Sequence, residues 1–260
     1  NNVLQAKTLL DLLVQFPPER FFCVSTDKAA NPANVMGAGK KLMENLLLAY
    51  ADRLPVTTAR FANVAFSNGS LPDGFLQRMA KNQPLSAPKD IRRYFVSPRE
   101  AGEICLLACI AGEPGNIFFP KLDESQLTAF TDIAKALLHE LGYKIDYCAS
   151  EDDAREKAAR YLPGADYYPV YFFDSDTSGE KPFEEFVTEG EAVRMDLFQS
   201  LGVIAATAPH SLPEMEAQLQ RLREVFRSED TDKGDLVTLM RELIPTFSHI
   251  ETGKGLDQKM

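Results

Sequence analysis

The stretch FFCVSTDKAANPANVMGAGKKLME, from Phe21 to Glu44, holds the pattern that decides the fold. It begins with an apolar run, Phe21–Val24, that is typical of a buried parallel strand. A polar group follows at once, then a loop with Asn31-Pro32, and a helix is predicted from about Asn34. The sequence therefore predicts a strand–loop–helix unit whose strand ends in polar side chains.

The polar group consists of Ser25, Thr26, Asp27 and Lys28. In an open α/β sheet, ligands bind at the carboxyl ends of the strands, so these side chains are candidates for a site. Each of them alone is as compatible with a solvated turn as with a binding role. Their grouping at one strand end favours the site.

The predicted helix carries Met36 and Lys40 four residues apart, so both lie on one face. Met43 and Leu47 continue this face, which places the Lys40 amine at an apolar seam. The alternative for Lys40 is a surface lysine whose stem covers apolar neighbours.

The segment STDKAANPANVMGAGK resembles the active-site segment of the nucleotide-sugar 4,6-dehydratases, which belong to the extended short-chain dehydrogenase/reductase family. The resemblance is to the polysaccharide-biosynthesis group that acts on UDP-N-acetylglucosamine. Arg60–Val64 is similar to the RFGNV of these enzymes, Asp90–Phe95 to their DITRYF, and Gly179–Glu191 to their PGEKLYEEL and TEGE. The resemblance runs from Asn2 to about Phe247 and covers the C-terminal two thirds of such an enzyme.

The resemblance implies an α/β fold that comprises the C-terminal part of a Rossmann-like doubly wound parallel sheet, a smaller α/β substrate-binding domain and C-terminal helices. The expected segments are a partial NAD-binding domain with the active-site strand and helix at 1–115, a substrate domain at 116–204 and a helical tail at 205–260. No GxGxxG occurs in the 260 residues. We therefore expect the family's Gly-rich NAD turn to lie outside the part that is matched here. A sheet cut in this way is expected to expose an edge and to make the chain a homo-oligomer.

Pattern and turn chemistry predict the remaining elements. We expect helices at 1–15, 73–81, 98–110, 127–141, 151–161, 211–227 and 235–244, strands at 55–61, 115–119 and 143–147, and a loop at 84–88.

By resemblance, Asp27 would protonate the departing C6 hydroxyl of the sugar and Lys28 would take the C5 proton. Thr26 would hydrogen-bond the 4-hydroxyl, and Lys40, with Ser25, would contact the nicotinamide cofactor. A lysine acts as a base only when it is neutral, and the cation Lys40 nearby would favour that form.

Position 36 is where the wider superfamily carries the tyrosine of YxxxK, which takes the 4-hydroxyl proton. A thioether cannot accept that proton. Larger polysaccharide-biosynthesis dehydratases carry Met there, so Met36 favours this branch, and Asp27 is the substitute that we expect.

The resemblance also implies substrate contacts, from Asn63 to the sugar, from Arg93 to the nucleotide diphosphate, and from Glu180 and Lys181. A guanidinium matches phosphate oxygens bidentately, which suits Arg93. Alone, Asn63 would be a turn residue and the Arg92-Arg93 pair an exposed basic spot. The implied cofactor is NAD, with NADP as the alternative, and the implied partner is a UDP-sugar.

The first interpretation is thus an NAD-dependent 4,6-dehydratase that makes a 4-keto-6-deoxy sugar for surface polysaccharide. The second, from another class, is a non-catalytic module that binds a sugar nucleotide or a partner chain. The third is a nucleotide-sugar 4-epimerase, against which Met36 argues because epimerases usually keep the tyrosine.

Composition argues against several classes of protein. A net charge of −10 makes a nucleic-acid backbone an unfavourable partner. The four cysteines lack CxxC spacing, so we expect buried free thiols, a reducing cytoplasm and no metal site. No apolar run has the length of a membrane span.

Overall fold

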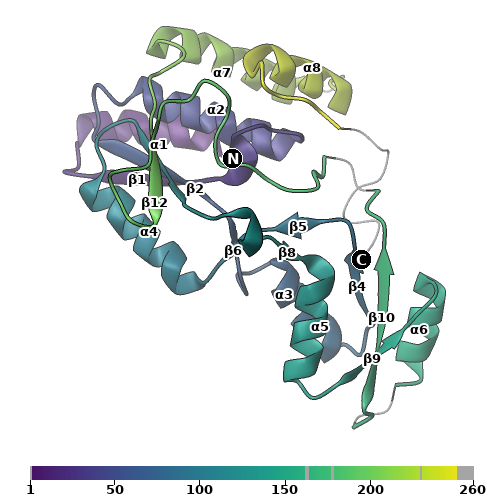
Figure 1. Ribbon diagram of the computed structural model, residues 1–260. Coiled ribbons are helices and arrows are strands. Elements are labelled where there is room, and N and C mark those ends of the chain that lie inside the picture. Colours follow the sequence, from purple (N-terminus) through teal and green to yellow (C-terminus); the bar gives the residue numbers. More distant parts are fainter. Residues whose placement is uncertain (1, 162–163, 177–178, 229, 251–260) are drawn as a thin grey trace.

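The computed structural model describes residues 2–161, 164–176, 179–228 and 230–250. The chain forms two lobes, and the larger one is built on a five-stranded sheet (Figure 1). The order of its strands is β1 (Phe21–Thr26), β2 (Val56–Phe61), β7 (Asn116–Pro120), β12 (Leu201–Ala205) and β11 (Val193–Arg194). The pairs β1–β2 and β2–β7 are parallel, whereas β12 runs antiparallel to β7 and to β11.

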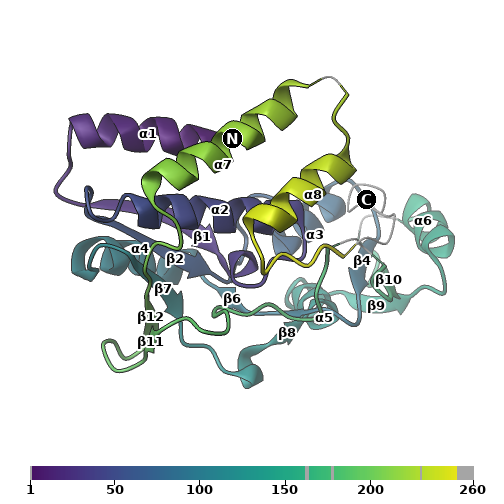
Figure 2. The same ribbon diagram turned by 90° about the horizontal axis from the view of Figure 1, so that it is seen from above.

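Helices cover both faces of this sheet. On one face lie α1 (Leu4–Gln15) and α2 (Val35–Ala49), and on the other lies α4 (Pro98–Ala111). Two C-terminal helices, α7 (Leu212–Arg227) and α8 (Lys233–Leu243), form an outer layer over α1 and α2 (Figure 2). Their apolar residues Met215, Leu219 and Met240 join the core of α2, which is therefore buried on two sides.

The smaller lobe has a three-stranded parallel sheet of order β4 (Leu85–Pro88), β10 (Tyr167–Phe173) and β9 (Lys144–Tyr147). Its helices are α3 (Leu71–Ala80), α5 (Phe130–Glu140) and α6 (Glu151–Ala159). Phe75, Leu138 and Tyr168 are among its buried core residues. The lobe is discontinuous in sequence, because α3 and β4 precede α4 and β7 of the main sheet whereas the other elements follow them.

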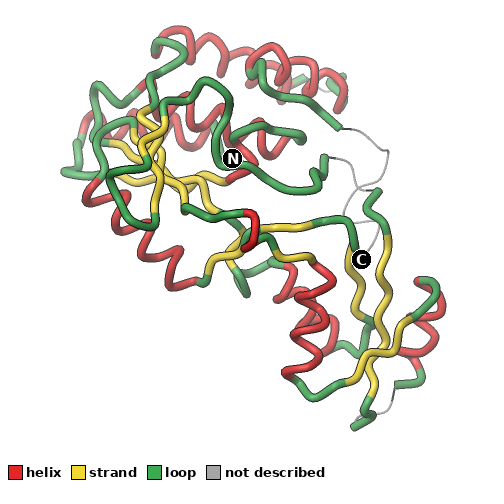
Figure 3. The backbone as a smooth tube through the Cα atoms, viewed as in Figure 1, coloured by secondary structure: helices red, strands yellow, loops and turns green. Residues whose placement is uncertain are grey.

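Short elements connect the two lobes (Figure 3). β3 (Asn63–Val64) pairs with β6 (Phe95–Val96), and β5 (Arg92–Arg93) pairs with β8 (Thr128–Ala129). Two 3-10 helices complete the set, η1 (Asp27–Ala29) directly after β1 and η2 (Glu124–Gln126) after β7.

The α/β class and the parallel sheet expected from the sequence are confirmed, and each expected helix and strand is present with shifted ends. The loop expected at 84–88 was wrong, since Leu85–Pro88 is β4, which pairs with β10. Leu85 and Ala87 are fully buried, so tertiary pairing outweighs the flanking prolines. The strands β10 and β12 were not foreseen.

The main sheet does not follow the expected segment boundary between residues 115 and 116. It takes β1 and β2 from one side of that boundary and β7, β11 and β12 from the other, because their apolar faces share one core. The binding roles given to these segments stay predictions. Residues 251–260, the end of the expected tail, lie outside the described residues.

All four cysteines are free thiols, and they are half-buried rather than buried. Within the described ranges, no helix combines the length and the apolarity that crossing a bilayer requires.

Candidate functional site

Asp27 and Lys28 form an ion pair at the carboxyl end of β1. The Nζ of Lys28 lies 3.3 Å from Oδ1 of Asp27, and the same oxygen accepts the hydroxyl of Thr26 and the backbone N–H of Lys28, each at 2.8 Å. Asp27 is buried, with 1% of its surface exposed, whereas the Lys28 side chain is 24% exposed. The structure therefore brings together the acid, the amine and the hydroxyl that the sequence singled out.

Local sequence fixes this arrangement. Thr26 ends β1 in an extended conformation and caps η1, while Asn34 caps α2 by accepting the N–H of Gly37 at 2.9 Å. A Cβ at position 37 would lie 2.5 Å from the carbonyl oxygen of Lys28, which no real side chain tolerates. Gly37 thus allows α2 to start directly against the ion pair.

Met36 and Lys40 leave the start of α2 toward different surroundings. The Nζ of Lys40 donates to the carbonyl of Val24 in β1 at 3.2 Å. Met36 is 50% exposed and lines an apolar groove of about 420 Å³ together with Leu222 and Phe226 of α7. Met43 and Leu47 lie in the core, so the apolar seam exists but the Lys40 amine reaches the strand instead.

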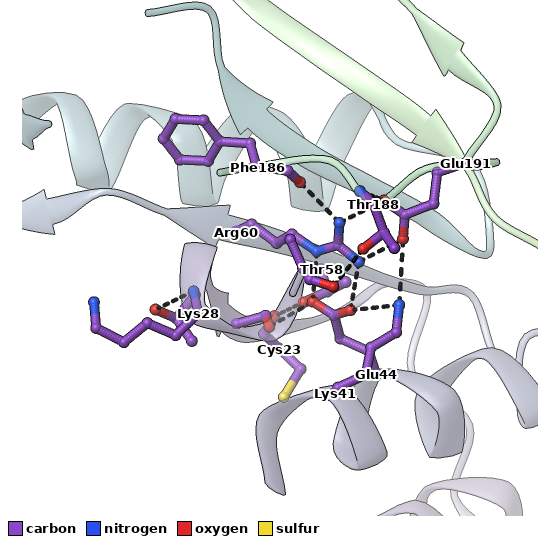
Figure 4. Close-up of polar contacts among 12 residues, drawn as sticks. Cys23, Lys28, Lys41, Glu44, Thr58, Arg60, Phe186, Thr188 and Glu191 are labelled. Atoms are coloured by element: carbon purple, nitrogen blue, oxygen red, sulfur yellow. Dashed lines mark hydrogen bonds and ion pairs between the residues drawn. The ribbon is translucent and has the colours of Figure 1, made fainter. Parts of the chain in front are cut away.

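Ser25 belongs to a separate buried network and does not bond to the Asp27–Lys28 pair. Its hydroxyl donates to Oε1 of Glu44 at 2.6 Å, and Glu44 in turn accepts two hydrogen bonds from Arg60. The other side of the Arg60 guanidinium binds Glu191 and the carbonyl of Phe186 (Figure 4).

The charged groups of this network stabilise one another in their charged forms. Burial by itself would lower the pKa of Arg60, but Glu44 and Glu191 outweigh it and raise that pKa above its ordinary value. Burial by itself would raise the pKa of Glu191, but its hydrogen bonds and charge contacts with Arg60, the N–H of Thr188 and the charge of Lys41 together lower it. Two cations, Arg60 and Lys41, face two carboxylates, so the buried charges balance.

A second cluster surrounds Arg93, which is 4% exposed. Its Nη1 donates to the carbonyls of Lys181 and Pro182 at 2.9 and 3.1 Å, and its Nη2 lies 3.8 Å from carboxylate oxygens of Glu180 and Glu184. The guanidinium that the sequence assigned to a phosphate is thus enclosed by the segment that resembles PGEKLYEEL.

The other substrate candidates lie at the same junction of the lobes. The Nζ of Lys181 is 3.3 Å from Oε2 of Glu184, an ion pair in which neither atom has another hydrogen-bond partner among the described residues. Glu180 accepts the hydroxyl of Ser175 at 2.5 Å. Asn63 in β3 donates its amide to the carbonyl of Tyr94 at 3.2 Å, next to Arg93.

Sequence reasoning missed Arg60, Glu44 and Glu191 as a buried unit. A signal was present, because Arg60 lies within a strand of apolar and β-branched residues and Glu44 interrupts an apolar helix. A charge at such a place is stable only with a partner of opposite sign.

Comparison with known families and structures identifies the family and the fold. A family model described as "Polysaccharide biosynthesis protein" matches residues 1–205. The chain belongs to this family. The fold expected from the sequence is also that of solved structures. Pen from Bacillus thuringiensis superposes with a TM-score of 0.61 at 17% identity, over 81% of this chain and 58% of that one. The dTDP-glucose 4,6-dehydratase of Bacillus anthracis, solved with NAD, gives 0.52 at 15% identity, over 72% and 59%.

Three curated relatives extend the comparison. The uncharacterized membrane protein MJ1061 of Methanocaldococcus jannaschii is 28% identical over 78% of this chain and 57% of its own length. The probable polysaccharide biosynthesis protein EpsC of Bacillus subtilis is 26% identical over 88% of this chain and 37% of its own length. The UDP-glucose 4-epimerase of Rickettsia canadensis is 31% identical over 55% of this chain and 43% of its own length. The chain thus spans less than two thirds of each of these relatives.

Proposed function

We propose that this chain carries the acid–base centre and the substrate side of a nucleotide-sugar 4,6-dehydratase that acts on a UDP-N-acetylhexosamine. The observation that carries the proposal is the contact of 3.3 Å between Lys28 and Asp27 at the end of a parallel strand. The family matched over residues 1–205 supports a role in polysaccharide biosynthesis.

Elimination of water from the sugar requires a base for the C5 proton and an acid for the C6 hydroxyl. In the structure, Asp27 and Lys28 are an ion pair. One proton passing from the ammonium to the carboxylate gives a neutral amine and a neutral acid. Lys28 then takes the C5 proton while Asp27 protonates the C6 hydroxyl, and water leaves.

The first step, removal of the 4-hydroxyl proton, needs an acceptor other than the thioether of Met36. Asp27 is the candidate, because Thr26 already donates its hydroxyl to Oδ1 and could hold the 4-hydroxyl beside it. Asp27 then releases that proton to solvent, so its carboxylate can accept the Lys28 proton before elimination. After hydride returns to C6 and a proton to C5, the product is a 4-keto-6-deoxy sugar.

Lys40 of α2, which reaches β1, is the residue that fits one end of a nicotinamide cofactor. The Lys40 amine lies beside the carbonyl of Val24, where it could also reach a ribose hydroxyl. The hydroxyl of Ser25 is committed to Glu44, so Ser25 does not fit this role in the present arrangement. When bound, NAD would supply the hydride acceptor for C4 and the hydride donor for C6.

For the nucleotide, we retain Arg93, Glu180, Lys181 and Asn63 as the candidates, since they gather at the junction of the two lobes. Contact between Arg93 and a diphosphate requires that the carboxylates of Glu180 and Glu184 give way to the phosphate oxygens. Their distances of 3.8 Å are long for ion pairs, which lowers the cost of that exchange.

The second candidate function is a 4-epimerase, which is favoured by the 31% identity to a UDP-glucose 4-epimerase. A binding module without turnover is the third. Met36 favours the dehydratase over the epimerase, because epimerases usually keep a tyrosine at this position whereas the larger polysaccharide-biosynthesis dehydratases carry Met.

A proton NMR time course of the purified chain with UDP-N-acetylglucosamine and NAD separates these functions. A 4-keto-6-deoxy product is the expected result. UDP-N-acetylgalactosamine as the product would replace the proposal by the epimerase. Line broadening of the substrate without turnover would replace it by the binding module.

A further inference from the structure

Residues Gly179–Glu191, hereafter the strap, cross from the smaller lobe to the main sheet. Two buried arginines form hydrogen bonds with this segment. Arg93 binds its first part through the carbonyls of Lys181 and Pro182, and Arg60 binds its last part through the carbonyl of Phe186 at 2.8 Å. Because carbonyls accept these bonds, the backbone of the strap is fixed and not only its side chains.

The anchor at Arg60 is the tighter of the two. Nη1 and Nη2 of Arg60 each lie 2.7 Å from one carboxylate oxygen of Glu191, whereas the carboxylates near Arg93 lie at 3.8 Å. Arg60 is 0% exposed, and Lys41 adds a second cation 3.2 Å from Glu191 (Figure 4). Charge-assisted, bidentate bonds of this kind fix geometry as well as adding energy.

Other residues of the strap contact the loop that follows Lys28. The hydroxyl of Thr188 donates to the carbonyl of Ala30, and the Asn31 amide donates to Glu185 at 2.7 Å. The Asn34 amide donates to the carbonyl of Gly179 at 3.0 Å. The loop 30–34, between the ion pair and the first turn of α2, therefore contacts the strap at both of its ends. The carbonyls of Pro32 and Ala33 in its middle accept the N–H groups of Ser248 and Ile250 instead.

We propose that Glu191 and Thr188 are positioning residues for the Asp27–Lys28 pair, which they hold in place through the strap and the loop 30–34. Neither residue touches the pair. Glu191 fixes the strap to Arg60, its neighbour Thr188 fixes the strap to Ala30, and Ala30 lies two residues after Lys28. The inference rests on the proposed function for its catalytic consequence, but the mechanical coupling stands on these contacts alone.

Backbone hydrogen exchange of the full chain without ligand tests the coupling directly. Glu191→Gln keeps the shape and removes the charge, and Glu189→Gln is the matched control because Glu189 is exposed. We expect amides of residues 27–34 to exchange at least tenfold faster in E191Q than in E189Q, with no change in α5. Equal rates in the two variants, or a uniform rise that includes α5, would overturn the proposal.

Thr188→Val provides an independent variant should E191Q fail to fold, since it removes only the bond to Ala30. We expect faster exchange at 27–34 without loss of protection in α1. Unchanged exchange at 27–34 in T188V would contradict the role of Thr188.

Kinetics add a readout that a merely structural role does not move. In turnover of UDP-N-acetylglucosamine, E191Q should lower kcat at least tenfold while KM stays within twofold, and Glu191→Asp should restore part of kcat. A rise in KM alone would overturn the proposal. Absence of turnover in the unsubstituted chain would count against the proposed function only, because the exchange experiment does not depend on activity.

Discussion

The guanidinium of Arg60 and the carboxylate of Glu44 form an ion pair with two hydrogen bonds, Nε to Oε1 at 3.0 Å and Nη2 to Oε2 at 2.8 Å. Both side chains are completely buried, and they join β2 to α2 beneath the candidate site. The pair therefore sets the distance between β2 and α2, which both contact η1, the short helix that begins at Asp27.

Substitution of Glu44 by Gln should destabilise the fold strongly. It leaves Arg60 short of one counter-charge and takes a charged acceptor from Ser25, and loss of one partner of a buried pair costs about 3–5 kcal/mol. Urea unfolding measures the change. The control is Glu103→Gln, which breaks the exposed pair with Arg99 and should cost far less, because water and salt screen exposed charges. Equal losses in the two variants would contradict a stabilising role for Glu44.

Acid should weaken the anchor of the strap. The pKa of Glu191 is lowered in the folded state, so its stabilising contribution is complete above its ordinary value of 4.5 and is lost as the pH falls through the lower folded value. We expect the free energy of unfolding to fall below pH 4.5, and to fall less steeply in E191Q. Parallel curves for the two proteins between pH 3 and 4.5 would show that Glu191 has no part in the loss.

The substitution Gly179→Ala should perturb the strap beyond the effect of backbone strain. Gly179 and Gly190 both have positive φ, +71° and +88°, which costs an alanine roughly 1–2 kcal/mol. A Cβ at 179 would also lie 2.6 Å from the Cβ of Asn34, whereas at 190 it meets nothing within 4 Å. G179A should therefore lose clearly more stability than G190A in the same denaturation assay, and a smaller loss would argue against close packing of the strap on the loop.

Replacement of Asp27 by Asn should abolish elimination and leave sugar-nucleotide binding intact, because the amide cannot protonate the C6 hydroxyl. NMR detection of the 4-keto-6-deoxy product measures the rate, and line broadening of the substrate measures binding. Asp152→Asn, on the exposed side of α6, serves as the control. An unaffected rate in D27N would remove Asp27 from the mechanism.

The open edge of the main sheet should support self-association. β1 is an edge strand, Val24 in it is 50% exposed, and Leu106 and Ile110 of the adjoining α4 are 62% and 66% exposed. We expect sedimentation at micromolar concentration to detect a homo-oligomer, and Val24→Lys to dissociate it, since a lysine blocks pairing at an edge. Val193→Lys, in the strand at the opposite edge, should leave it intact. If the unsubstituted chain sediments as a monomer, the prediction is wrong.

Periodicity and turn chemistry predicted the helices well, because signals such as the capping box Ser97–Glu100 act within a few residues. They failed at β4 and β10, where pairing between segments about 80 residues apart decides the structure. The sequence pattern predicted that Thr26, Asp27 and Lys28 group at the end of a strand, and the structure has them in contact, while their chemical roles stay predictions. Neither the pattern nor the resemblance indicated that Ser25 faces Glu44 or that Arg93 is enclosed, since both follow from packing across the whole chain.

The smaller lobe takes α3 and β4 from before α4, and its remaining elements from after β7. No contiguous gene segment therefore encodes it. A recombination event that exchanged this lobe as one block would also replace a helix and a central strand of the main sheet. Its evolution is consequently tied to that of the sheet, and single substitutions alter this lobe more readily than the transfer of a module does.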